Sequence, residues 1–119
     1  MKFYVCETGG TALLLTADDR PMPGLKELVP GRVDGAVEKH VPVRLDGTAP
    51  GRVTVSVGQV EHPMEAEHWI QWIALETDRG VTVRRLCPGQ PPKAEFALLP
   101  GEKALAAYAC CNLHGLWKA

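Results

Sequence analysis

The sequence has no long apolar run and no block of basic residues. No stretch approaches the roughly 20 apolar residues that span a bilayer. The first ten residues, MKFYVCETGG, contain no apolar region of the kind found in signal peptides. Lysine and arginine number 13 against 14 acidic residues, without the basic and aromatic interleaving of nucleic-acid-binding surfaces. We therefore expect a cytoplasmic protein that binds neither membranes nor nucleic acid.

Cysteine is also scarce, and two of the four cysteines, Cys110 and Cys111, are neighbours. A disulfide between neighbours is strained, and thiols in a reducing compartment more often bind metals or take part in redox chemistry. The spacing from Cys111 to His114 is that of a metal-binding Cys-x-x-His pair. Adjacent residues of a strand point to opposite faces, so only one of the two thiols can readily face a metal. The spacing does not say which one.

The apolar residues follow a period of two along most of the chain. RVTVSVG, residues 52–58, places Val53, Val55 and Val57 on one face. GVTVRRL and KAEFALL alternate in the same way, HWIQWIALET is apolar on both faces, and turn-forming residues separate these runs. Short strands at this spacing predict an all-β antiparallel sandwich or barrel. The only segment that we expect to be helical is GLKELV, residues 24–29.

Each of the four histidines lies at a strand end or in a connection. We expect His40 to open a strand, His62 to lie in a loop before Pro63, His68 to begin the next strand and His114 to follow the last one. A single histidine at such a place is usually a solvated polar residue. Four of them together with a cysteine favour a metal site, because a β-scaffold carries its chemistry at strand ends and in loops.

Four stretches resemble the desulfoferrodoxin and neelaredoxin family of superoxide reductases. They are EKHVPV, VGQVEHPMEAEHWIQWIAL, PGQPPKAEF and CNLHGLWK, in this order from about Val33 to the C-terminus. The motifs HPM-x3-H and C-N-x-H-G-x-W are specific in combination. The resemblance implies an immunoglobulin-like antiparallel β-sandwich over residues 35–119, with a small N-terminal β appendage over residues 1–34. It also implies the reduction of superoxide to hydrogen peroxide.

The resemblance also implies the site. It assigns one iron ion per chain, alternating between Fe²⁺ and Fe³⁺, to five protein ligands. Cys111 is the axial thiolate, because the cysteine of the motif directly precedes Asn112. Lys39 is the residue that attracts superoxide and orders a proton-donating water, and Glu38 is the carboxylate that occupies the sixth position of the oxidised iron. The equatorial nitrogen ligands are His40, His62, His68 and His114.

The N-terminal segment departs from the two-iron members of the family. It resembles a desulforedoxin domain that has lost its metal, since Cys6 has no partner cysteine at Gly9 and no cysteine pair at Ala17 and Asp18. We therefore expect no built-in electron relay and an external donor such as a rubredoxin. The segment is a candidate dimer interface or cap in a homodimer or homotetramer. Cys87 matches no motif.

Two alternatives to the enzyme remain. One is a non-catalytic iron protein that transfers electrons or stores metal through the same ligands. A vacant sixth position and Lys39 favour the enzyme, because an electron carrier gains nothing from a position that invites oxygen chemistry. The other is a zinc or structural site in a binding module, which five ligands argue against because closed zinc sites have four.

Overall fold

The computed structural model describes residues 2–6, 11–14 and 23–119, without the side chains of residues 11–14, 47 and 48. Contacts divide the chain into two compact units, Met1–Pro30 and Gly31–Ala119. No helix in the described ranges has both the length and the apolar character needed to cross a membrane. The predicted all-β antiparallel class is confirmed in both units.

The first unit is a three-stranded antiparallel sheet in which β1 (Lys2–Cys6) lies between β2 (Thr11–Leu14) and β3 (Leu25–Leu28). The prediction of a helix in GLKELV was wrong, because Leu25–Leu28 is a strand. Six residues are too few for a stable isolated helix, whereas pairing with β1 satisfies the backbone at once. The positions of Gly9, Ala17 and Asp18 lie outside the described residues.

The second unit is a sandwich of two antiparallel sheets. One has the order β10-β9-β6-β7 and the other the order β4-β5-β8. The bounds are β4 Pro42–Ala49, β5 Arg52–Val57, β6 Ile70–Thr77, β7 Gly80–Arg85, β8 Lys93–Ala97, β9 Ala104–Cys111 and β10 Gly115–Lys118. The core lies between the sheets and includes Val55, Ile73, Phe96 and Ala109. The alternation predicted for β5 is confirmed, since Val53, Val55 and Val57 are all buried.

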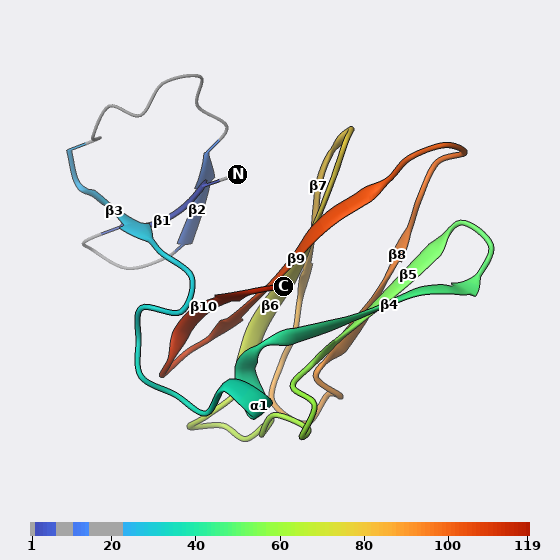
Figure 1. The fold of residues 1–119 in the computed structure, drawn as a ribbon. Coiled ribbons are helices and arrows are strands. Elements are labelled where there is room, and N and C mark those ends of the chain that lie inside the picture. Colours follow the sequence, from blue (N-terminus) through green and yellow to red (C-terminus); the bar gives the residue numbers. More distant parts are fainter. Residues whose placement is uncertain (1, 7–10, 15–22) are drawn as a thin grey trace. The chain divides into compact units, whose positions relative to one another are not determined.

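A short helix, α1 (Val37–His40), precedes the sandwich. His40 therefore ends a helix instead of opening a strand, and β4 begins two residues later at Pro42. Proline suits this position because it lacks the N–H that a helix interior needs. Figure 1 shows α1 and the connection between β5 and β6 at the same end of the sandwich. Strand β10, after His114, was not predicted.

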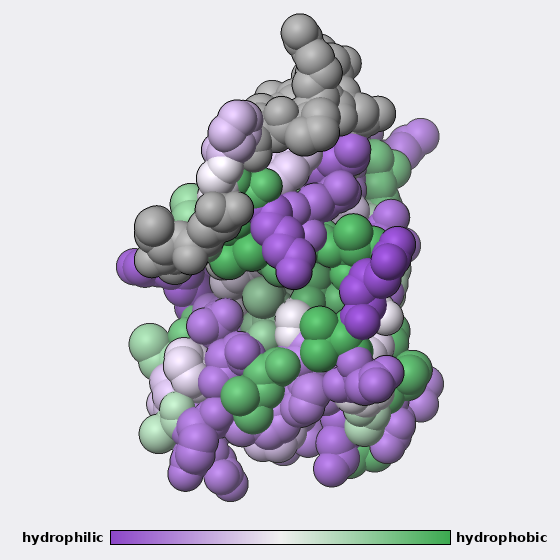
Figure 2. Space-filling view, turned by 90° about the vertical axis from the view of Figure 1, so that its left-hand side faces the viewer, coloured by the Kyte–Doolittle hydropathy of each residue, from purple (hydrophilic) through white to green (hydrophobic). Residues whose placement is uncertain are grey.

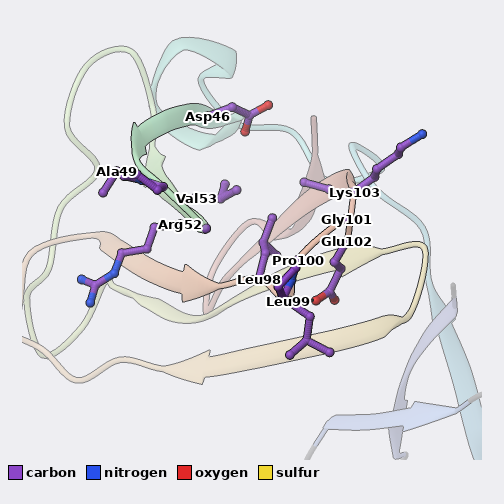
Figure 3. A pocket seen from close by; sticks show the side chains of 13 residues that line it. Asp46, Ala49, Arg52, Val53, Leu98, Leu99, Pro100, Gly101, Glu102 and Lys103 are labelled. Atoms are coloured by element: carbon purple, nitrogen blue, oxygen red, sulfur yellow. Dashed lines mark hydrogen bonds between the residues drawn. The ribbon is translucent and has the colours of Figure 1, made fainter.

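The opposite end of the sandwich has an open groove of about 620 Å³. Its walls come from the β4–β5 hairpin and from the connection between β8 and β9 (Figure 3). Strand β9 starts at this groove with Ala104 and ends seven residues later with Cys111, so the groove is about 23 Å from the histidine end. None of the residues that line it is a predicted ligand.

Hydrophobic and hydrophilic residues are interspersed on the face shown in Figure 2. Exposed large apolar side chains occur singly along the described chain, for example Val37, Leu99 and Leu113. Scattered apolar side chains of this kind are normal on protein surfaces. The features that distinguish this molecule therefore lie at the end of the sandwich near α1.

Candidate metal centre

Five predicted ligands come together at one end of the sandwich, from four separate segments. His40 ends α1, His62 and His68 lie in the β5–β6 connection, Cys111 ends β9, and His114 lies in the turn before β10. The ligand atoms of His40, His62, His68 and Cys111 all lie within 4.8 Å of one another. This separation lets a single ion contact all four.

The four imidazole rings form a nearly square arrangement. Around the square, ring centroids are 4.6 Å apart for His40 and His62, 4.6 Å for His62 and His68, 5.0 Å for His68 and His114, and 4.7 Å for His114 and His40. The diagonal from His40 to His68 is 6.2 Å. Neighbouring rings are steeply inclined, at 68–80°, while the diagonal pair is inclined by only 31°. A ring of donors of this shape fits the equator of one ion.

His114 and Cys111 complete the set of donors. Nδ1 of His114 lies 3.0 Å from Nε2 of His40 and 3.6 Å from Sγ of Cys111. Cys111 is 2% exposed and is the last residue of β9. The thiol is therefore close to the imidazoles and shielded from water.

Hydrogen bonds set the tautomers of two rings. Nδ1–H of His40 donates to the carbonyl oxygen of Ala36 at 2.7 Å, and Nδ1–H of His62 donates to that of Pro63 at 2.7 Å. Each neutral ring then has only an acceptor lone pair on Nε2. These two Nε2 atoms lie 3.2 Å apart, which is unfavourable unless a cation lies between them.

His68 supplies a further orphaned donor atom. Its Nε2 is buried and has no hydrogen-bond partner among the described residues. A buried polar atom without a partner is costly in a folded protein. Together with the facing Nε2 atoms of His40 and His62, it shows that the donor set fits a bound metal ion.

Burial keeps these imidazoles neutral. It is the main cause that lowers the pKa of His40, of His62 to about 4, and of His68. The neighbouring histidines lower all three further, because positive charges gathered at one point repel each other. At neutral pH the rings are therefore in the form that binds metals.

The two adjacent cysteines have different environments. Cys110 pairs with Trp72 and Cys111 with Ile70 across β6 and β9, so the two side chains point to opposite faces of the sheet. Burial is the first cause that raises the pKa of the Cys110 thiol to about 12, and the neighbouring Cys111 adds to it. Cys110 is a packed neutral thiol, whereas Sγ of Cys111 belongs to the cluster.

Lys39 and Glu38 lie on α1 next to His40, and both are exposed. Burial and the neighbouring His114 are the larger causes that lower the pKa of His68, and the positive charge of Lys39 lowers it further. Burial is the largest cause that lowers the pKa of His40, and the negative charge of Glu38 acts in the opposite direction. Neither side chain makes a hydrogen bond or ion pair with the described part of the chain. The structure thus places the ammonium group of Lys39 and the carboxylate of Glu38 on the helix that ends in His40, and no described hydrogen bond or ion pair fixes their side chains.

Trp117, the last residue of the C-N-x-H-G-x-W motif, and Gly58, to which the sequence assigned no role, help to build this end of the sandwich. Trp117 stacks on His40 with ring centroids 5.0 Å apart, and its Nε1–H donates to the carbonyl oxygen of His114 at 3.0 Å. Gly58 has φ +85°, and a Cβ there would lie 2.2 Å from the carbonyl oxygen of Val60 and 2.7 Å from that of Lys39. The Gly-Gln dipeptide after a strand was the available signal for a special turn at Gly58.

Comparisons with known proteins identify relatives of this chain. The family model "Desulfoferrodoxin" matches residues 32–119. A desulfoferrodoxin of Nitratidesulfovibrio vulgaris is 47% identical over 116 residues, covering 97% of this chain and 84% of the relative. A superoxide reductase of Pyrococcus abyssi is 36% identical over 97 residues, covering 68% of this chain and 84% of the relative. The solved superoxide reductase of Treponema pallidum is 34% identical with a TM-score of 0.82, covering 100% of this chain and 99% of that one. The chain belongs to the desulfoferrodoxin family.

Proposed function

We propose that the chain is a superoxide reductase with a single non-haem iron bound by four imidazoles and one thiolate. The observation that carries the proposal is the square of four histidine rings with the Cys111 thiol beside it. Relatives and solved structures named superoxide reductase support it. The proposed ligands are His40, His62, His68, His114 and Cys111.

The donor set suits iron better than zinc. Structural zinc sites close with four ligands in a tetrahedron, whereas a square of imidazoles with one thiolate leaves a sixth position open. A ferrous ion held there supplies the one electron that, with two protons, converts superoxide to hydrogen peroxide. The neutral imidazoles leave the centre positively charged, which favours an anionic substrate.

Lys39 and Glu38 are the proposed catalytic residues. Lys39 attracts superoxide toward the open position and orders a water that delivers a proton. The effect of its charge on His68 supports a position close to the imidazoles. Glu38 would occupy the sixth position of an oxidised iron, and the effect of its carboxylate on the pKa of His40 supports a position close to that ring. Both side chains are exposed, so Lys39 is free to turn toward an incoming anion and Glu38 toward the metal site.

The proposal also covers the electron donor, the cellular compartment, the division into domains and the oligomeric state. Electrons come from an external donor such as a rubredoxin, since the described cysteines form no second cluster. The four free cysteines suit a reducing cytoplasm. Residues 1–34 form a metal-free segment, and residues 35–119 form the iron-binding domain. The assembly is a homodimer or a homotetramer, as the family resemblance implies.

The test is metal analysis together with the visible spectrum of the mildly oxidised protein. We expect one iron per chain and a broad long-wavelength band from the thiolate to ferric iron. Reductant removes this band, Cys111→Ser abolishes it, and the control Cys110→Ser keeps it. Superoxide oxidises the ferrous protein stoichiometrically without evolution of oxygen, which separates the enzyme from a mere electron carrier and from a dismutase. Zinc, or iron without the band, refutes the proposal.

A further inference from the structure

The side chain of Asn112 joins the turn after β9 to the segment before β6. Its Oδ1 accepts a hydrogen bond from the backbone N–H of Trp69 at 3.0 Å, and its Nδ2 donates to the carbonyl oxygen of Glu67 at 2.9 Å. The backbone N–H of Asn112 donates to the carbonyl oxygen of Trp69 at 3.2 Å. One residue therefore binds the main chain on both sides of His68.

These bonds extend the pairing of β6 and β9 beyond its last regular pair. The regular ladder ends where Ile70 faces Cys111. Past that pair, the amide side chain of Asn112 forms the hydrogen bonds that a strand backbone would otherwise form, with the N–H of Trp69 and the carbonyl oxygen of Glu67. The segment around His68 is thus connected directly to the residue that follows the Cys111 thiol.

The main-chain N–H and carbonyl groups of His68 itself also form hydrogen bonds. Its N–H donates to the carbonyl oxygen of Glu65 at 3.1 Å, and the N–H of Glu65 donates to the carbonyl oxygen of His68 at 2.9 Å. This small loop is local, spanning only residues 65–68, and cannot by itself place His68 against another part of the fold. The long-range link comes from Asn112, 45 residues from Glu67.

His68 depends on its main chain more than His40 and His62 do. The rings of His40 and His62 are each held by a hydrogen bond from Nδ1 to a carbonyl oxygen. In the part of the chain that the structure describes, no hydrogen bond holds the ring of His68, and its buried Nε2 has no partner. The placement of that Nε2 therefore follows the placement of the backbone.

We propose that Asn112 is a positioning residue that holds His68 at its distance from Cys111 and so sets the metal affinity of the site. The inference rests on the proposed function, since it takes His68 and Cys111 to be ligands. Asn112 is not one of the proposed ligands, and its Oδ1 lies 3.9 Å from Sγ of Cys111. Residues that orient metal ligands typically affect metal affinity by about 10–100-fold.

The test compares Co²⁺ binding to the wild-type chain and to Asn112→Ala. The dissociation constant is measured by competition with a chelator, and the thiolate-to-cobalt band is recorded at saturation. We expect binding that is about 10–100-fold weaker and a band that persists at a shifted energy. The shifted band distinguishes a changed geometry of the ligands from a general loss of stability.

Thr77→Val is the matched control. Thr77 lies at the opposite end of β6, where its hydroxyl donates to Oε1 of Glu102 at 2.6 Å and lies 3.3 Å from the carbonyl oxygen of Gly80. This variant likewise removes side-chain hydrogen bonds that anchor the same strand, but far from the site. It is expected to lower the melting temperature and to leave the affinity for Co²⁺ and the band unchanged.

A double-mutant comparison tests whether Asn112→Ala changes the affinity for Co²⁺ through His68. In a His68→Ala background, Asn112→Ala is expected to change the affinity by less than about twofold, because its target is already gone. In a His62→Ala background the full effect should remain. A full effect without His68, or wild-type affinity and band in Asn112→Ala, overturns the inference. If the wild-type chain itself binds without a thiolate band, the proposed function fails instead.

Discussion

At the scale of single residues, the site is prepared for a cation by two short hydrogen bonds. The bonds from Nδ1 of His40 and of His62 to carbonyl oxygens turn both Nε2 lone pairs inward. Burial lowers the pKa of both rings, so protons do not occupy those lone pairs at neutral pH. The fold therefore holds two facing lone pairs that a bound cation would stabilise.

Lys39 is a residue whose charge acts at a distance. We expect Lys39→Ala to lower the second-order rate constant for superoxide by about tenfold at low ionic strength, because electrostatic steering adds at least this much. Iron content should stay at the wild-type level. The measurement is the decay of superoxide after rapid mixing, at low and at high ionic strength.

The control is Lys103→Ala, which removes the same charge at the groove on the far end of the sandwich. It is expected to change the rate little, since that charge is about two Debye lengths from the histidines at 0.1 M salt. A rate for Lys39→Ala equal to the wild-type rate at low ionic strength would remove Lys39 from the mechanism.

The sequence predicted the ligand residues through a family resemblance, and local patterns alone could not bring them together. His40 and His114 are separated by 74 positions, and their approach depends on the pairing of β9 with β10 and on the turn at Gly58. The role of Asn112 was equally invisible, because its partners lie 43 and 45 positions away. Long-range hydrogen bonds leave no periodic signal.

At the scale of elements, prediction succeeded where a pattern is long. The alternation of β5 extends over six residues with one buried face and identified the strand. The predictions for three four-residue elements were wrong. β3 was predicted as a helix, β10 was not predicted, and α1 was predicted as the start of a strand. A segment of four residues has too few side chains to distinguish the two periods, so its partner strand or neighbouring turn decides.

The helix α1 is braced by the turn after β5. Gly58 N–H donates to the carbonyl oxygen of Val41 at 3.1 Å, and Val60 N–H donates to that of Glu38 at 3.0 Å. Because a Cβ at Gly58 would collide with the backbone of Lys39 and Val60, only glycine allows this close approach. The brace places the segment that contains Glu38, Lys39 and His40.

We expect Gly58→Ala to destabilise the protein and to weaken metal binding. The left-handed conformation alone costs an alanine about 1–2 kcal/mol, and relief of the collision must displace α1. Gly101→Ala is the matched control, since Gly101 has φ +79° but a Cβ there would meet no atom within 4 Å. Urea unfolding and iron content measure the two effects. Equal loss of stability in both variants, with full iron content, would contradict the brace.

At the scale of the whole molecule, the buried imidazoles link stability to pH. The pKa of His62 is lowered to about 4 in the folded chain, chiefly by burial, from 6.5. Between these values the unfolded chain binds more protons than the folded one, so the free energy of unfolding rises with pH. His40 and His68 act in the same direction, because burial lowers the pKa of each.

The prediction concerns the metal-free protein. Its free energy of unfolding should increase from about pH 4 to about pH 6.5 and lose this dependence above that range. Urea unfolding at steps of half a pH unit measures it. His62→Gln should make the curve less steep, because glutamine does not titrate while His40 and His68 still do. A stability that is constant or falls with increasing pH across this window would mean that the imidazoles are not held neutral by the fold.

The second compact unit contains the complete proposed metal site. All five proposed ligands, α1, Gly58 and the core between the two sheets belong to Gly31–Ala119. We therefore expect residues 31–119 alone to fold cooperatively, to bind one iron and to show the thiolate band of the full chain. Thermal unfolding, metal analysis and the visible spectrum of the shortened chain measure this. A shortened chain that folds but binds no iron would give the first thirty residues a part in the metal centre.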